Sequence, residues 1–278
     1  MISLGAVLAP SVGWGQDAPQ KPQSPQGSRI DAMRRLANSA TLAEFEDGKA
    51  GPSLALQAEP LLHYGDPARG IREGTLWAWG RARGGRAAAL MKVEYWPGAE
   101  GEAGHWGLAV GALAPRPVSV EFPDRLHWTS RKPGLAMTAL PDAPAPADTP
   151  AQRLTQAKTL ARRFAVQVDT HRKAGTLQLR LLPKPVSRYD DPDAGLVDGV
   201  FFALVHATNP ITLLALEVRT GDRRASAWSY GFARFGDGEA TAKLDGKAVW
   251  TVPFIDSAQA DSELYMTRPM PEGAENRE

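Results

Sequence analysis

The stretches YGDPARGIREGTLWA (residues 64–78) and YDDPDAGLVDGVFFA (residues 189–203) are two versions of one pattern. They belong to longer segments, 60–94 and 185–219, that align without a gap at a constant offset of 125. Nine positions are identical in the two segments: Pro60/Pro185, Tyr64/Tyr189, Asp66/Asp191, Pro67/Pro192, Gly70/Gly195, Gly74/Gly199, Ala78/Ala203, Ala82/Ala207 and Val93/Val218. The chain therefore reads as a duplicated fold unit.

The repeat continues beyond these segments at an offset of 122, where Trp106 aligns with Trp228 and Trp128 with Trp250. A residue that both copies share is explained first by folding. The repeat therefore separates residues that serve the architecture from those in which the two copies differ, where a function has to be sought.

Each copy is predicted to open with a helix. In the first copy, Ser28 and Asp31 form a capping box, and apolar residues at helical spacing predict a helix over about residues 29–46. In the second, Thr149 is the N-cap and Pro150 occupies the first helical position. The apolar stripe that follows extends to Phe164.

The rest of each copy alternates apolar and polar or small residues, which predicts antiparallel strands joined by tight turns. The predicted strands are residues 54–58, 75–80, 88–95, 105–113, 118–122 and 125–130, then 176–182, 200–207, 212–220, 226–235, 240–244 and 248–253. In the first copy the Gly84-Gly85 pair supplies a hairpin turn, and in the second Thr208-Asn209-Pro210 takes its place.

These elements predict a β-dominated α+β fold. Neither copy alone covers both faces of its sheet, so we expect the halves to pack around a pseudo-two-fold axis as one continuous sheet or a closed barrel. The predicted segments are a signal-like and disordered leader (1–27), a first repeat (28–130), a Pro-rich linker (131–148), a second repeat (149–255) and a flexible tail (256–278).

The first residues resemble an export signal. Residues 2–12 form an apolar run of suitable length and Gly13–Gly15 supplies small residues for cleavage, although no basic residue precedes the run. The run is too short to span a membrane. We therefore predict an exported protein, periplasmic or extracellular, that is not transmembrane.

Bulk composition excludes several classes of function. There are 32 Lys and Arg against 31 Asp and Glu, so the chain has no strong field for nucleic acid. Cysteine is absent, which excludes disulfides, thiol nucleophiles and thiolate metal sites. No phosphate loop and no serine-hydrolase elbow occurs, and we predict no cofactor.

The chain resembles a group of exported proteins from planctomycete bacteria for which no activity is known. The resemblance covers roughly residues 30–252 and rests on the 64–78 pattern above, on Arg180-Leu-Leu-Pro183, on Asp198-Gly-x-Phe-Phe-Ala203 and on Trp228 downstream. It implies an exported location and carries no catalytic residue, cofactor or activity.

Candidate catalytic groups are few. The acids Asp66, Glu73, Asp191 and Asp198 recur in both copies, and a pair of them could serve a hydrolase. Acid-Pro and acid-Gly pairs are turn formers, which is the simpler explanation. The five histidines have no metal-ligand spacing, so we predict no metal site and assign no catalytic residue.

The residues that differ between the copies are the candidates for binding. Large aromatics without an aromatic counterpart suit a pocket wall, and histidines without one are not required by the fold. The candidate ligand-binding residues are Trp79, Trp96, His63, His127 and His206.

The leading hypothesis is a non-enzymatic exported domain that binds a small molecule, a glycan or an envelope protein at the seam between the repeats. The alternative is a carboxylate-dependent hydrolase of cell-envelope material, which requires two of the four acids in one open cleft. A third possibility is a structural envelope component, which predicts a filled interior without a pocket.

Overall fold

The structure is a computed structural model that describes residues 25–273, apart from 47–48, 82–84, 124–126, 131, 133, 170–174, 221–226, 257–260, 263 and 272. Residues 1–24 of the predicted signal and leader lie outside the described residues. Neither helix in the described ranges is long and apolar enough to cross a membrane.

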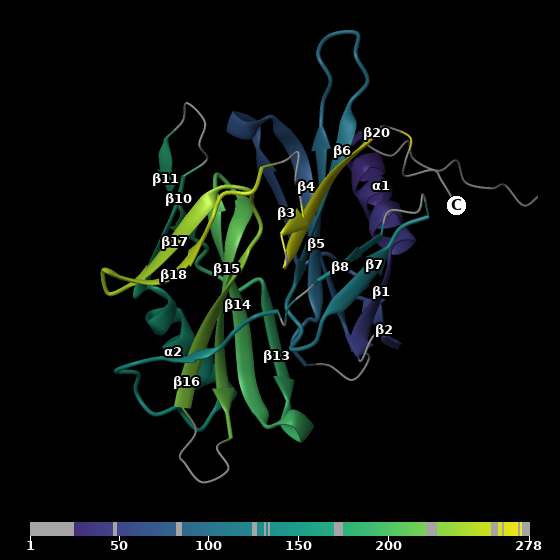
Figure 1. Ribbon diagram of the computed structural model, residues 1–278. Helices are drawn as coiled ribbons and strands as arrows, with labels where there is room; N and C mark the ends of the chain where they lie inside the picture. Colours follow the sequence, from purple (N-terminus) through teal and green to yellow (C-terminus); the bar gives the residue numbers. More distant parts are fainter. Residues whose placement is uncertain are drawn as a thin grey trace, which may run out of the picture.

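The first half of the chain folds into one helix and a large antiparallel sheet (Figure 1). The strand order is β19-β20-β6-β5-β4-β2-β1-β7-β8, with β3 also paired to β4. The elements are α1 (Pro25–Ser39), β1 (Thr41–Glu46), β2 (Lys49–Leu56), β3 (Leu62–Asp66), η1 (Pro67–Arg69), β4 (Ile71–Gly80), β5 (Ala89–Trp96), β6 (His105–Ala112), β7 (Val118–Glu121) and β8 (His127–Thr129), with β19 (Asp261–Ser262) and β20 (Tyr265–Pro271) from the C-terminal end.

The second half folds into one helix and two antiparallel sheets, ordered β11-β10-β17-β18 and β12-β14-β15-β16-β9, with β13 also paired to β14. Its elements are α2 (Pro150–Ala161), β10 (Phe164–Asp169), β11 (Thr176–Gln178), β12 (Arg180–Leu181), β13 (Ser187–Asp191), η2 (Pro192–Ala194), β14 (Leu196–His206), β15 (Asn209–Arg219), β16 (Ala227–Arg234), β17 (Glu239–Leu244) and β18 (Lys247–Val252), with β9 (Thr138–Ala139) from the linker.

The two halves have matching strand neighbours. In the first half, four strands are neighbours in the order β2-β1-β7-β8. In the second half, β11-β10-β17-β18 are neighbours in the same way. The run β3-β4-β5-β6 likewise recurs as β13-β14-β15-β16. In both halves a 3₁₀ turn that begins at the Asp-Pro pair leads into the longest strands, and a glycine with positive φ ends it.

Each helix lies in the apolar interior of its own half. The first-half sheet curls around α1 in a nearly closed, barrel-like form, and its interior includes Met33, Leu36, Trp77 and Trp106. In the second half, α2 packs against both sheets around Phe202 and other large side chains. The tryptophans that the repeat pairs, Trp106/Trp228 and Trp128/Trp250, belong to or pack against these two interiors.

A third core joins the two halves, and we call it the seam. On β4 the odd-numbered Trp77 and Trp79 face α1, whereas Leu76 and Ala78 face the seam. On β14 the even-numbered Phe202 faces α2 and its neighbours face the seam. Both faces of these central strands are therefore buried. The seam residues include Tyr64, Leu76, Ala78, Leu90 and Leu113 from the first half and Tyr189, Phe201, Ala203, Leu213 and Phe235 from the second.

The predicted arrangement of the halves as one continuous sheet is wrong. In the described residues, no strand of the predicted second repeat (149–255) pairs with a strand of the first (28–130), and these halves meet at the seam. The strands that pair outside their own repeat are β9 of the linker and β20 of the C-terminal segment. A continuous sheet would leave the seam faces of β4 and β14 in water. Face-to-face packing buries them, which stabilises the fold by about 25 cal/mol per Å² of apolar area.

The first predicted helix is too long. It ends at Ser39, and Thr41–Glu46 forms β1, which pairs with both β2 and β7. Leu42 and Glu44 are buried, and the sequence TLAEFE alternates at the period of a strand. Phe164, predicted on the second helix, likewise begins β10.

The C-terminal segment and the linker also differ from the prediction. Tyr265–Pro271, in the predicted flexible tail, forms β20 and pairs along the whole of β6. Thr138–Ala139, in the predicted linker, forms β9 and pairs with β16. Both strands satisfy edge main-chain groups that would otherwise be exposed.

The offset of 125 does not hold through the whole aligned segment. Tyr64 faces Gly74 and Tyr189 faces Gly199, as the offset requires. On the next strand, Gly74 pairs with Glu94 but Gly199 pairs with Glu217, so the offset there is 123. The two hairpins differ in length, because residues 81–88 connect β4 to β5 whereas residues 207–208 connect β14 to β15.

The shared Tyr and Gly form a packing pair in each half. A side chain at Gly74 would place its Cβ 2.5 Å from the Tyr64 ring, and at Gly199 2.2 Å from the Tyr189 ring. The Tyr hydroxyls reach Glu94 at 2.9 Å and Glu217 at 3.1 Å. The aromatic ring thus covers the facing glycine, a known way of filling the space that glycine leaves in a sheet.

We expect Gly74→Ala to lower the free energy of unfolding by about 1–3 kcal/mol, because the methyl group overlaps a ring that is buried on all sides. Urea unfolding followed by fluorescence measures the loss. Gly80→Ala on the same strand is the control, since its Cβ would come no closer than 3.8 Å to a neighbouring atom. Equal effects of the two substitutions would contradict the packing pair.

Candidate functional site

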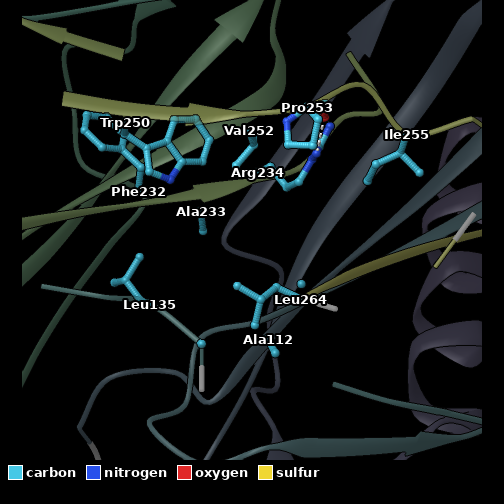
Figure 2. Close-up of a pocket in the computed structure, with 12 residues that line it drawn as sticks. Ala112, Leu135, Phe232, Ala233, Arg234, Trp250, Val252, Pro253, Ile255 and Leu264 are labelled. Carbon is cyan, nitrogen blue, oxygen red and sulfur yellow. Dashed lines mark hydrogen bonds between the residues drawn. The ribbon is translucent and has the colours of Figure 1, made fainter. Parts of the chain in front are cut away.

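An apolar pocket of about 340 Å³ opens at the seam, and we call it the seam pocket (Figure 2). Its walls come from both halves, from the linker and from the C-terminal segment. The lining residues are Gly111, Ala112, Gly134, Leu135, Phe232, Ala233, Arg234, Trp250, Val252, Pro253, Ile255 and Leu264. Arg234 is the one charged residue among these twelve.

The pocket lies beside the end of β16, beyond the point where its neighbour β9 stops pairing with it. In the first half, β20 pairs with β6 from His105 to Gly111. In the second half the corresponding edge strand, β16, is paired by β9 only at Ser229 and Tyr230. The linker then turns to the first half, where the Leu135 amide donates to the carbonyl of Leu113 at 3.3 Å. The end of β16 therefore borders a space rather than another strand.

Two aromatic rings form one end of the seam pocket. Phe232 and Trp250 stack with ring centroids 5.4 Å apart and an interplanar angle of 29°. Figure 2 shows both rings side by side, across the pocket from Leu264 and Ala112. At the offset of 122 their first-half counterparts are Val110 and Trp128, which are buried in the core around α1. The same two positions thus fill a core in one half and line a pocket in the other.

Arg234 lies beside Pro253 at another side of the pocket (Figure 2). Its Nε donates to the carbonyl of Gly236 at 3.0 Å, its Nη1 to that of Pro253 at 2.7 Å and its Nη2 to that of Gly238 at 2.7 Å. Burial lowers the pKa of this guanidinium below its usual value. The Tyr265 ring lies 5.9 Å from its Cζ.

A smaller polar pocket of about 140 Å³ surrounds Lys92, also at the seam. The ammonium of Lys92 donates to Asn209 Oδ1 at 2.6 Å and to the Phe235 carbonyl at 3.2 Å, and it pairs with Glu94 at 2.9 Å. Burial lowers the pKa of Lys92, and Glu94 opposes that shift. The three contacts use the three donors of the ammonium, so Lys92 joins the halves rather than presenting a reactive amine.

A second polar pocket, of about 170 Å³, surrounds Arg219 in the matching place of the other half. There Glu217 is fully buried and accepts from Tyr189, Arg86 and Arg219, at 3.1, 3.1 and 3.2 Å. The contact between Arg86 and Glu217 crosses the seam. Beside each polar pocket a glutamate thus accepts from the Tyr of its own half and pairs with a basic residue of the protein: Glu94, which is partly buried, and Glu217, which is fully buried.

The five candidate ligand-binding residues do not come together. Trp79 is 2% exposed and packs toward α1. Trp96 lines the Lys92 pocket and stacks on His105 with centroids 5.9 Å apart. His63 and His127 are exposed on β3 and β8. His206 lies 2.9 Å from Asp66, an interaction that joins the halves. Of the five, Trp96 alone lines one of the described pockets.

Two of the four acids proposed for a hydrolase hold the helices to the sheets. Glu73 forms an ion pair with Arg29 of α1, and Asp198 pairs with Arg153 of α2 at 2.9 Å. Arg188 adds a second contact to Asp198, at 2.6 Å. These are matching contacts of the two halves, and they explain why an acid precedes the shared glycine.

The other two acids lie at the Asp-Pro turns. Asp191 accepts from the Ala194 amide at 3.1 Å, as an acid that caps a 3₁₀ turn does, and Asp66 pairs with His206. None of the described pockets is lined by two of the four acids. In the described ranges, no three His, Asp or Glu residues cluster as a metal site would require.

Sequence reasoning missed the two residues that give the seam pocket its character. The pairing with Trp128 predicts a core position for Trp250, which does pack against the second-half core but lines the pocket as well. Arg234 was not singled out, although its counterpart at the offset of 122 is Ala112 and the strand AWSYGFAR carries no other charge. The exchange of Ala112 for Arg234 between the copies is the feature of the sequence that could have marked Arg234 as a candidate site residue.

No family model, curated protein or solved structure matches this chain. The resemblance to exported planctomycete proteins and the exported location therefore stay predictions from the sequence.

Proposed function

We propose that this chain is an exported, non-enzymatic domain, built from a duplicated helix-and-strand unit, that binds a small apolar molecule in the seam pocket. The observation that carries the proposal is the pocket of about 340 Å³ between the halves, lined by eleven uncharged residues and Arg234. Pockets that bind small molecules are concave, mostly apolar and often lie between domains.

The matching strand neighbours support the duplication, and with it a pseudo-two-fold relation of the halves. The residues that both copies share have structural roles in each half: the Tyr that covers a glycine, the Asp-Pro turn and the acid that anchors the helix. At the seam pocket the two copies differ in their neighbouring strands, because β20 pairs along the whole of β6 whereas β9 pairs with two residues of β16.

The lining favours an apolar molecule over a glycan. A sugar presents hydroxyl groups in all directions and needs several convergent polar side chains, whereas here Arg234 is the one polar side chain in the lining. The carboxylate-dependent hydrolase is disfavoured because the four acids form separate contacts with their own partners.

The test uses N-phenyl-1-naphthylamine, a neutral apolar probe whose fluorescence rises in apolar surroundings. We expect saturable binding of one probe per chain to the wild-type protein. Val252→Trp fills the pocket and should weaken binding at least about tenfold, because the added ring occupies space that the probe needs. Val249→Trp is the matched control on the same strand, where the side chain is exposed.

Thermal unfolding of both variants shows that they are folded before binding is compared. If the probe does not bind the wild-type protein, or binds Val252→Trp as well as Val249→Trp, the seam pocket is not a binding site.

A further inference from the structure

Among the described residues, no carboxylate contacts the charged residue of the seam pocket, Arg234. Arg234 is 8% exposed, and its hydrogen bonds go to three main-chain carbonyls. The acid that acts on it electrostatically is Asp237, which lies 3.6 Å from Arg69. A buried cation without a direct counter-ion is costly in a protein, because water no longer solvates it.

The guanidinium also keeps donors to spare. Arginine has five N–H groups, and the carbonyl contacts of Arg234 use one each on Nε, Nη1 and Nη2. One N–H on Nη1 and one on Nη2 remain without a partner among the described residues. Two N–H groups on one guanidinium match the two oxygens of a carboxylate, which is the strongest of the common charge-assisted pairs.

The lining of the seam pocket around Arg234 indicates the chemistry of the rest of the ligand. Phe232, Trp250, Val252 and Leu264 offer apolar surface, and the described lining includes no charged side chain besides Arg234. Arg234 is specific to this half, because Ala112 occupies the corresponding place on β6. The first half therefore folds without an arginine at the position that Arg234 occupies in the second half.

We propose that the seam pocket takes an amphipathic monoanion, an apolar chain or ring that ends in a carboxylate, with Arg234 as its counter-ion. The inference rests on the proposed function and names the class of its ligand. The apolar body lies against Phe232 and Trp250, and the ligand carboxylate supplies a direct ion-pair contact that Arg234 does not make with Asp237 or another described acid.

Calorimetric titration of the whole chain with octanoate, octan-1-ol and octylamine tests this directly. The three probes share one apolar chain and differ only in the charge of the end group. We expect octanoate to bind at least about tenfold more tightly than octan-1-ol, and octylamine to bind more weakly than octan-1-ol. This comparison needs no variant, so it decides the matter even if Arg234 cannot be replaced.

Substitution then assigns the preference to Arg234. Arg234→Met should bind octanoate and octan-1-ol equally, and Arg234→Lys should keep part of the preference. Arg163→Met, which removes a surface charge that is paired with Asp245, is the control and should behave as wild type.

The outcomes separate this inference from the proposed function. Equal binding of octanoate and octan-1-ol to the wild-type protein would overturn the anion preference and leave the apolar site standing. A preference that survives in a folded Arg234→Met would place the anion elsewhere. Failure of all three probes to bind would remove the proposed function itself.

Discussion

A chain that ends after Asp256 should be largely unfolded at 25 °C. The truncation removes β20, which pairs with β6 at seven positions from Tyr265 to Pro271. Tyr265, Met266 and Met270 are at most 7% exposed, and the loss of each costs about 1.5–3 kcal/mol of burial. The sum is comparable to the whole stability of a typical domain, which is about 5–15 kcal/mol. Far-UV circular dichroism and a thermal melt measure the result.

A chain that ends after Gly273 is the control, because it keeps all of β20. We expect its melting temperature to match that of the full chain. If the chain ending after Asp256 melts cooperatively within about 3 °C of the full chain, then β20 contributes little, and the C-terminal segment behaves as the loose tail that the sequence predicts.

Replacing Lys92 with Met should lower the free energy of unfolding by about 2–4 kcal/mol, because Glu94 would then be a partly buried charge without its cation. Asn209 and the Phe235 carbonyl would lose their donor as well. All three contacts lie at the seam, so the loss reports how strongly the halves are joined there. Urea unfolding at pH 7 measures it.

A second substitution shows whether the charge is the cause. The double variant Lys92→Met/Glu94→Gln should recover at least about 1 kcal/mol, since a neutral amide can still accept from Tyr64. Lys184→Met, at an exposed loop position, should change stability by less than about 0.5 kcal/mol. A Lys92→Met variant as stable as Lys184→Met would contradict the assigned role.

The lowered pKa of Lys92 also gives a pH dependence with a definite sign. The unfolded chain titrates this amine near 10.5, whereas the folded chain releases the proton at a lower pH. In that window the unfolded state binds more protons, so the free energy of unfolding rises with pH. Lys92→Met should remove this rise. Above pH 10 the raised pKa values of Tyr64 and Tyr189 act in the opposite direction, so the comparison belongs below that pH.

Local patterns predicted much of the secondary structure. The alternation of Trp77, Ala78 and Trp79 indicated a strand, and the cap at Thr149 placed the start of α2, whose amide contact from Gln152 is observed at 3.3 Å. The polar composition of the chain after Pro253 predicts a loose tail and not β20. Pro269 and Pro271 are also unusual residues for a strand. They are tolerated there because β20 pairs with β6 along one edge, while β19 contacts only its first two residues.

The site was less accessible from sequence. The repeat assigns the residues that both copies share to the architecture. Tyr64, Asp66 and Glu73 each make a contact within the protein that fits this assignment. Trp250 packs against the second-half core, as the repeat predicts, but it also lines the seam pocket, which its counterpart Trp128 does not. What makes the pocket is the short reach of β9 along β16, and the lining residues are up to 153 positions apart, from Gly111 to Leu264. The local sequence of β16 does not show where the strand beside it ends, so the pocket could not be predicted from that sequence.

The most direct test of the seam pocket follows the indole ¹H–¹⁵N resonances of the eight tryptophans during a titration with octan-1-ol. Trp250 lines the pocket, whereas its counterpart Trp128 is buried in the core around α1. We predict that the Trp250 resonance shifts progressively and saturates while that of Trp128 stays in place. A Trp250 resonance that does not move at saturating octan-1-ol, or that moves no more than Trp128, would contradict a binding site at the seam.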